Sequence, residues 1–289
     1  MGVRSLGYVR LTSPDPDAWL RFGGEFMGMM AVEEPEPGSV AFRIDDHPAR
    51  LVILPGDAGT AAIGFEVDHR GARAELAAGL EGRGIEVRSG SPEECEHRRV
   101  TGFVGFTDPD GNPIELYYGP YLEHTAVRTR EVSGFVTGDM GMGHAIVSVE
   151  DLDAAYDLYT GVLGFRERNT MAGGRVVFLG CNPRQHSFGL GRRRGPGSLM
   201  HLMVEVATLD DVGRALDRAY RLNVPMMQSL GRHTNDRMVS FYVHSPEGLA
   251  IEYGWDGLRV EEEVPTFEIT EGAFWGHHST PPPTGRGPL

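Results

Sequence analysis

Residues 142–165, MGHAIVSVEDLDAAYDLYTGVLGF, decide the fold, because an earlier part of the chain has the same pattern. Residues 6–29, LGYVRLTSPDPDAWLRFGGEFMGM, align with them at a constant offset of 136. Identical residues coincide at four pairs: Gly7 with Gly143, Asp17 with Asp153, Ala18 with Ala154 and Gly28 with Gly164. Each stretch predicts a strand, a turn and an amphipathic helix that ends at a glycine.

Two further pairs of segments repeat at nearly the same spacing. Residues 106–119 (FTDPDGNPIELYYG) match 243–255 (VHSPEGLAIEYGW) at an offset of 137, and residues 62–87 match 201–226 at an offset of 139. The first pair indicates a strand, a tight turn and a returning strand, and the second a strand followed by a helix. We therefore predict an α+β fold of four βαβββ modules. They form two similar domains, 1–130 and 137–280, each a curved mixed sheet, followed by a disordered tail at 281–289.

Composition and charge exclude several classes of partner. The formal net charge is -14, so the chain would repel nucleic-acid phosphates and anionic lipid surfaces. Its 2 cysteines indicate no disulfide framework, and the first residues do not resemble a signal peptide. No apolar run approaches the length of a membrane span. We expect a cytoplasmic protein that binds neither nucleic acid nor membrane.

The second half carries metal-binding side chains that the first half lacks. His144, His201 and Glu252 stand where the first half has Tyr8, Ala62 and Glu115. Two imidazoles and one carboxylate on separate strands are typical of a non-haem Fe(II) site, in which one face of the ion stays open. A single histidine on a strand is more often a hydrogen-bonded structural residue, and Glu115 occupies its position without matching histidines. Only the three side chains together therefore indicate a metal site.

Longer motifs around these residues carry a family resemblance. The stretches are LGRHTNDRMVSFYVHSPEGLAIEYGW (230–255), FLGCNPRQHSFGL (178–190), MHLMVEVATLDDVG (200–213), MGMGHAIVS (140–148) and FWGH (274–277). With them the chain resembles the type I extradiol ring-cleaving dioxygenases of the vicinal oxygen chelate superfamily, over residues 1 to about 278. The resemblance implies cleavage of a catechol, such as an aryl-substituted or bicyclic 1,2-diol, by insertion of O₂ next to the hydroxyls. It also implies a homo-oligomer.

The resemblance assigns roles residue by residue. It implies a metal, Fe(II) or alternatively Mn(II), held by His144, His201 and Glu252. It further implies three catalytic side chains, His186, His233 and Tyr242, and places near the substrate Ile146, Phe178, Asn235 and Asp236. The repeat partner of Tyr242 is Gly105, so this phenol is peculiar to the half with the expected metal.

Departures and alternatives accompany this interpretation. Gln185 and Met200 stand where many relatives have a histidine, next to functional histidines, and we expect activity to survive both changes. The remaining histidines are interpreted as structural or surface residues, with His277 closing the C-terminal segment over the pocket. A non-catalytic binding protein of the same superfamily is the main alternative. A glyoxalase-like isomerase or a metal-dependent resistance transferase is the other enzymatic one.

Overall fold

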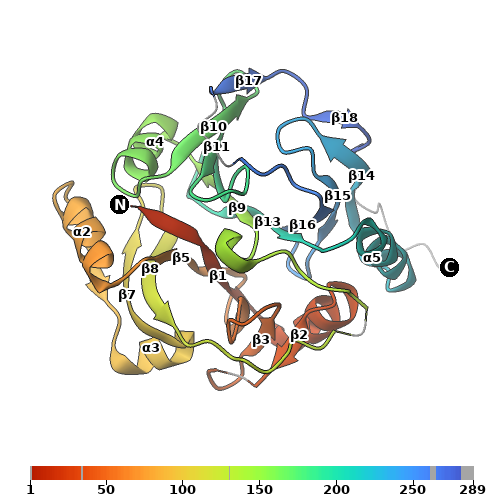
Figure 1. Ribbon diagram of the computed structural model, residues 1–289, viewed down its shortest axis with the longest axis horizontal. Helices are drawn as coiled ribbons and strands as arrows, with labels where there is room; N and C mark the ends of the chain where they lie inside the picture. Colours follow the sequence, from red (N-terminus) through yellow and green to blue (C-terminus); the bar gives the residue numbers. More distant parts are fainter. Residues whose placement is uncertain (1, 34, 130, 261–264, 281–289) are drawn as a thin grey trace.

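The first half of the chain forms one mixed sheet. The computed structural model describes residues 2–33, 35–129, 131–260 and 265–280. Within these residues the first sheet has the strand order β2-β3-β4-β1-β5-β8-β7-β6 (Figure 1). Its strands are β1 (Val3–Ser13), β2 (Met30–Val32), β3 (Val40–Arg43), β4 (Leu51–Pro55), β5 (Gly59–Val67), β6 (Arg88–Ser89), β7 (Val100–Thr107) and β8 (Pro113–Pro120).

The second half forms a second mixed sheet with the same plan and one added strand at each edge. Its order is β17-β10-β11-β12-β9-β13-β16-β15-β14-β18. The strands are β9 (His144–Val149), β10 (Arg166–Met171), β11 (Val176–Gly180), β12 (Phe188–Arg192), β13 (Leu199–Glu205), β14 (Met226–His233), β15 (Val239–His244), β16 (Ala250–Trp255), β17 (Phe267–Ile269) and β18 (Ala273–Trp275).

The predicted modules are confirmed, and the structure adds that their strand registers match. In each sheet two modules meet at an antiparallel pair of first strands, β1 with β5 and β9 with β13. Each first strand also pairs in parallel with the last strand of its own module. The helices between are α1 (Pro16–Trp19), which continues as the π-helical segment η1 (Leu20–Phe26), α2 (Arg70–Glu81), α4 (Leu152–Gly161) and α5 (Leu209–Arg221).

Two local features differ from the pattern read in the sequence. The first amphipathic helix is α-helical for one turn only and then widens into η1. A further helix, α3 (Pro92–Arg98), follows β6 and was not predicted. The sequence nevertheless contains a helix-start signal here, since Ser91 and Glu94 form a capping box that satisfies the first backbone N–H groups. Arg98 at the end of α3 reaches Glu115 in the first sheet.

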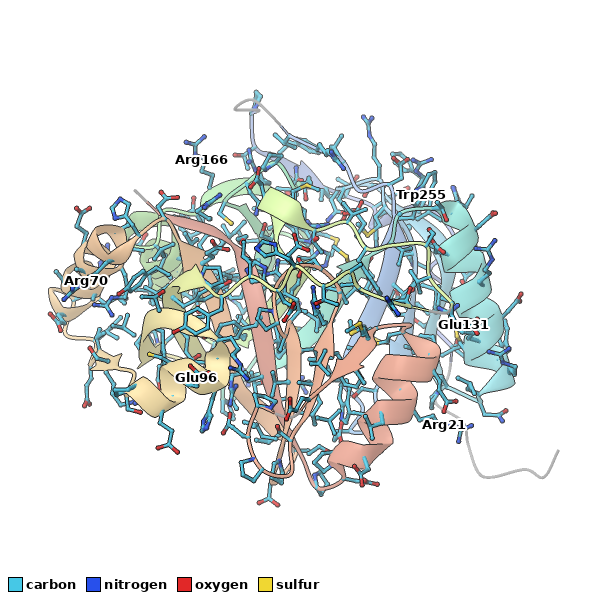
Figure 2. All side chains as sticks on the ribbon, turned by 60° about the horizontal axis from the view of Figure 1, so that its bottom comes forward. Arg21, Arg70, Glu96, Glu131, Arg166 and Trp255 are labelled. Atoms are coloured by element: carbon cyan, nitrogen blue, oxygen red, sulfur yellow. The ribbon has the colours of Figure 1, made fainter. Side chains whose placement is uncertain are left out.

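One hydrophobic core joins the two halves. Phe65 of β5 packs edge-on against Phe165 and Phe188 of the second half, at ring centroid distances of 5.3 and 5.2 Å. At the other end α5 lies beside α1 and η1 (Figure 2), where Arg218 Nε donates to the Phe26 carbonyl at 2.8 Å. The two sheets are therefore held against each other from both ends.

A short 3-10 turn, η2 (Gly138–Met140), leads into β9.

Two expectations concern the limits of the chain. Among the residues described, no helix combines the length and the apolar character that a membrane span needs. The tail predicted at 281–289 lies outside the described residues.

Candidate metal centre

Three adjacent strands bring the predicted ligands together. His144 begins β9, His201 lies in β13 and Glu252 lies in β16. The register sets Met203 opposite both His144 and Glu252, and side chains two residues apart share one face of a strand. His201 therefore projects on the same face as Met203. A side chain at Gly143 would put its Cβ 1.9 Å from the Met203 carbonyl oxygen, so glycine is needed before His144.

The three ligand atoms have the spacing of one coordination face. His144 Nε2 lies 2.9 Å from His201 Nε2 and 3.2 Å from Glu252 Oε2, and His201 Nε2 lies 3.7 Å from the same oxygen. Ligands at about 2.1 Å from one ion and at right angles to each other are about 3.0 Å apart. His144 and Glu252 are each only 1% exposed, so an ion here would be shielded from solvent. The residues fit a metal held by two nitrogens and one oxygen.

Electrostatics favour the protonation states that a metal requires. Burial alone would raise the pKa of the Glu252 carboxyl, but hydrogen bonds from His144 and His233 hold it well below its usual range. Burial and the neighbouring His144 lower the pKa of His201 to about 3. The site therefore offers an ionised carboxylate and a neutral imidazole near pH 7, which are the forms that bind metals.

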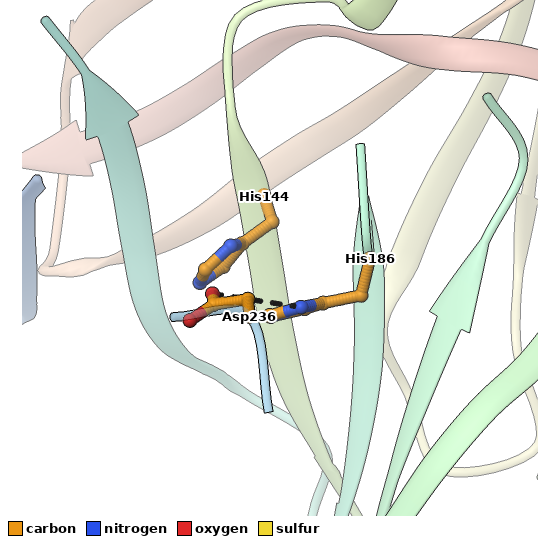
Figure 3. Close-up of side chains that lie close together, drawn as sticks. All are labelled: His144, His186 and Asp236. Atoms are coloured by element: carbon orange, nitrogen blue, oxygen red, sulfur yellow. Dashed lines mark ion pairs between the residues drawn. The ribbon is translucent and has the colours of Figure 1, made fainter. Parts of the chain in front are cut away.

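His144 also belongs to a second group of possible ligands. It lies with His186 and Asp236 in a compact cluster (Figure 3), where His186 Nδ1 is 3.9 Å from Asp236 Oδ2. The same His186 Nδ1 lies 2.6 Å from Gln185 Oε1, and the rings of His144 and His186 contact each other with centroids 4.0 Å apart and planes tilted by 31°. A nitrogen bonded in this way is not free to ligate, so the set with Glu252 is the better metal site.

The chain also fixes the orientation of His186. Gln185 Oε1 can only accept a hydrogen bond, so the His186 Nδ1 next to it must donate one. The amide nitrogen of Gln185 donates in turn to Asn169. The proton of neutral His186 is therefore on Nδ1, and Nε2 keeps its lone pair. Burial and the neighbouring His144 hold the pKa of His186 well below its usual value. This series of hydrogen bonds from His186 through Gln185 to Asn169 was not predicted from the sequence, because it forms only where the loop between β11 and β12 brings Gln185 next to β10.

His233 and Tyr242 form a hydrogen-bonded pair beside the carboxylate. His233 Nε2 lies 2.9 Å from Tyr242 Oη and 3.3 Å from Glu252 Oε1. Burial and the charge of Glu252 raise the pKa of Tyr242 well above its usual value, so the phenol stays protonated. Ser240 also donates to Glu252, at 2.6 Å, and was missed. It is two residues before Tyr242 on the same strand face, a spacing that points to it.

These side chains line a cavity of about 510 Å³. All of the sequence-predicted site residues lie along it, including Ile146, Phe178, Asn235 and Asp236. Ile146 and Phe178 pack with Ile269 of β17 into an apolar wall. The sequence did not single out several other lining residues: Met171, Val176, Met227, Gln228 and Ala273. His277, which was expected to close the C-terminal segment over the pocket, also lines the cavity.

The carboxylate at the corresponding place in the first half is held in an ion pair. Tyr8 Oη donates to Glu115 Oε2 at 2.6 Å, and Arg98 donates to both carboxylate oxygens at 2.7 and 2.5 Å. Glu115 is only 6% exposed, so a guanidinium provides there the positive charge that a metal would provide beside Glu252. These partners explain how a carboxylate can be buried at Glu115 although no histidines lie beside it.

Comparisons with known proteins agree with this geometry. Residues 141–253 match the family model "Glyoxalase/Bleomycin resistance protein/Dioxygenase superfamily", and residues 6–56 match "Dihydroxybiphenyl dioxygenase BphC D1". The chain is 39% identical to an iron-dependent extradiol dioxygenase of Rhodococcus jostii (strain RHA1), over 96% of this chain and 97% of that protein. It is 38% identical to a biphenyl-2,3-diol 1,2-dioxygenase of Metapseudomonas furukawaii, over 96% and 95%.

A solved structure shows the same fold throughout. The crystal structure of BphC, a halotolerant catechol dioxygenase, superposes with a TM-score of 0.92 at 34% identity and covers 96% of this chain and 95% of that one. Because the curated relatives exceed a third identity over nearly the whole chain, the resemblance extends to both halves. The protein belongs to the extradiol dioxygenase family of the vicinal oxygen chelate superfamily.

Proposed function

We propose that this protein cleaves the ring of a catechol next to its hydroxyls, with Fe(II) held by His144, His201 and Glu252. The observation that carries the proposal is the spacing of the three ligand atoms, 2.9 to 3.7 Å, on one wall of the cavity. Mn(II) suits the same ligands. We propose iron because the relative at 39% identity is named as iron-dependent.

The charge of the site suits an anionic diol. Two neutral imidazoles and one carboxylate leave a divalent ion with a residual positive charge, which favours a deprotonated catechol. The ion, when bound, would supply Lewis acidity toward the diol and the electron transfer that activates O₂. The protein itself orients the ring, excludes water and holds protons.

Tyr242 and His233 are proposed to stabilise the diol oxygens. The Tyr242 hydroxyl keeps its proton and lies in the cavity, so it can donate a hydrogen bond to a negatively charged oxygen. His233 supports it through the contact between Nε2 and the phenol oxygen. The ring of His233 is itself held by its Nδ1, which donates to the Gly272 carbonyl at 3.0 Å.

His186 is proposed to move a proton. With Nδ1–H donated to Gln185, its free Nε2 can accept a proton and later return it as an acid. Asp236 lies nearby, and its carboxylate accepts from the Met238 N–H at 3.0 Å. We assign Asp236 and Asn235 to the polar side of the substrate pocket.

The apolar wall argues for a ring substituent on the substrate. Ile146 and Phe178, with Met171 and Val176 beside them, form one side of the cavity. An aryl or fused second ring would displace water from this surface, and each buried square ångström contributes about 25 cal/mol. We therefore propose an aryl-substituted or bicyclic catechol, such as 2,3-dihydroxybiphenyl, in preference to unsubstituted catechol.

The test begins with anaerobic loading of Fe(II), followed by 2,3-dihydroxybiphenyl and air while visible absorbance is recorded. A yellow ring-opened product that requires iron is expected. His201→Ala should abolish both the colour and the metal content, whereas His124→Ala, which changes an exposed histidine, should alter neither. Absence of colour with iron bound, across a panel of catechols, would favour the non-catalytic binding protein.

Broader expectations accompany this function. We propose domain limits of 1–130 and 137–280, supported by the division of the strands into two sheets. We also propose a cytoplasmic homo-oligomer that binds neither nucleic acid nor membrane, consistent with the net charge of -14. Light scattering of the purified protein tests the oligomeric state.

A further inference from the structure

The C-terminal segment 265–280 lies outside the four modules and returns to the cavity. After β16 the chain adds β17 in parallel to β10 and β18 antiparallel to β14. Beyond β18, the Ser229 N–H donates to the His278 carbonyl at 3.0 Å and the Thr280 N–H to the Met227 carbonyl at 2.9 Å. The first sheet, by contrast, consists of β1 to β8 alone. This segment is therefore an element that only the half with the candidate metal site has.

The segment holds His233 from one side through its backbone. The Gly272 carbonyl accepts from His233 Nδ1 at 3.0 Å and from the Thr234 N–H at 3.3 Å. The hydroxyl of Thr234 donates to the Glu271 carbonyl. His233 Nε2 is thereby left to face Tyr242 and Glu252.

The same segment covers the face of the His233 ring. His277 stacks on His233 with a centroid distance of 4.0 Å and an interplanar angle of 17°, and it meets Tyr242 edge-on at 5.7 Å. The close approach needs glycine at position 231, because a Cβ there would lie 2.4 Å from the His277 backbone nitrogen. A hydrogen bond at the edge and a ring against the face together leave His233 little freedom to turn.

The conformation of His277 is unfavourable when considered alone. Its φ is +53°, in the left-handed region that non-glycine residues rarely adopt. Both of its ring nitrogens are buried and have no hydrogen-bond partner among the described residues. Such a conformation persists only where surrounding contacts enforce it, and these sites often have functional roles. The contacts that enforce it here are the rings of His233 and Tyr242.

We infer that His277 is a positioning residue for His233: its ring acts as a flat support that keeps His233 Nε2 aimed at Tyr242 and the substrate oxygens. The catalytic role of His233 rests on the proposed function, whereas its positioning by His277 does not. An aromatic ring suffices for the support, so phenylalanine should replace His277 and alanine should not. The neighbouring His278 has an exposed side chain and provides a matched control.

The first experiment uses metal-free protein with ¹⁵N-labelled histidine rings, and His233→Gln assigns the signal of His233. A slowly exchanging Nδ1–H proton is expected in the unsubstituted protein, in His278→Ala and in His277→Phe. In His277→Ala it should exchange at least about tenfold faster, because the ring can turn away from Gly272. Equal exchange in His277→Ala and His278→Ala would overturn the inference, as would a Phe variant as mobile as the Ala variant. If His277→Ala does not fold, His277→Leu takes its place.

The second experiment measures turnover of 2,3-dihydroxybiphenyl by the iron-loaded variants. His277→Ala should lower kcat about ten- to a hundredfold at unchanged iron content and nearly unchanged KM, as expected when a supporting contact is lost. His277→Phe should remain within about threefold of the unsubstituted protein. A mobile His233 with full turnover would support the positioning and refute the catalytic role of His233. If no variant turns over, the proton-exchange result still decides the positioning.

Discussion

The hydroxyl of Tyr8 donates to Glu115 at 2.6 Å, and these two residues occupy in the first sheet the places that His144 and Glu252 occupy in the second. The register is the same in both sheets, since Gly64 faces Tyr8 and Glu115 as Met203 faces His144 and Glu252. One backbone plan thus supports two sites of different chemistry. In one a buried carboxylate is neutralised by Arg98, and in the other it lies beside His144 and His201, with which it is proposed to hold a metal.

Arg98→Met is expected to destabilise the protein by about 3–5 kcal/mol, because it leaves the Glu115 carboxylate buried without its cation. Arg88→Met is the control, since Arg88 and its partner Glu94 form an exposed pair whose loss costs about 0–1 kcal/mol. Urea unfolding of both variants measures the difference. Equal midpoints would show that Arg98 does not neutralise Glu115.

Glu252→Gln and Glu115→Gln form a matched pair across the repeat. The first removes the charged ligand and should abolish stoichiometric metal binding while the fold is retained. The second should leave metal binding of the folded protein intact, because Arg98 already occupies that carboxylate. Metal analysis after anaerobic loading and desalting decides the question. Retention of iron by Glu252→Gln would contradict the ligand assignment.

Gln185→Leu should reduce kcat about tenfold with iron content unchanged, because His186 loses the acceptor that fixes its proton on Nδ1. His124→Ala is a suitable control, since His124 is exposed and does not line the cavity. Steady-state turnover of 2,3-dihydroxybiphenyl gives the comparison. A kcat for Gln185→Leu equal to that of the control would mean that His186 needs no such orientation.

Cys181 should resist alkylation in the native protein. Burial raises the pKa of its thiol to about 12, although the Ser187 hydroxyl opposes this, and the thiol donates to the Arg4 carbonyl at 3.3 Å. Near neutral pH very little of this thiol would then be the reactive thiolate. Mass spectrometry after iodoacetamide treatment should show Cys181 labelled in urea but not in buffer. Comparable labelling under both conditions would refute this prediction.

The repeat was the most informative feature of the sequence. Because strands that follow the same plan keep the same register, the offsets near 137 were enough to place His144, His201 and Glu252 at matched points of one sheet. Helix α3 was missed although its capping signal at Ser91 and Glu94 is local. Ser240 was missed although it shares a strand face with Tyr242.

By itself the sequence determined the four modules, their division into two similar halves and the three ligand types at matched positions, because these follow from periodicity and from repetition along the chain. Only the tertiary structure decided that Arg98 neutralises Glu115, that Gln185 orients His186 and that His277 lies on His233. Each of these contacts joins side chains from a loop, a helix end or the C-terminal segment to a strand. No spacing in the sequence encodes such contacts, since they depend on where the folded chain returns.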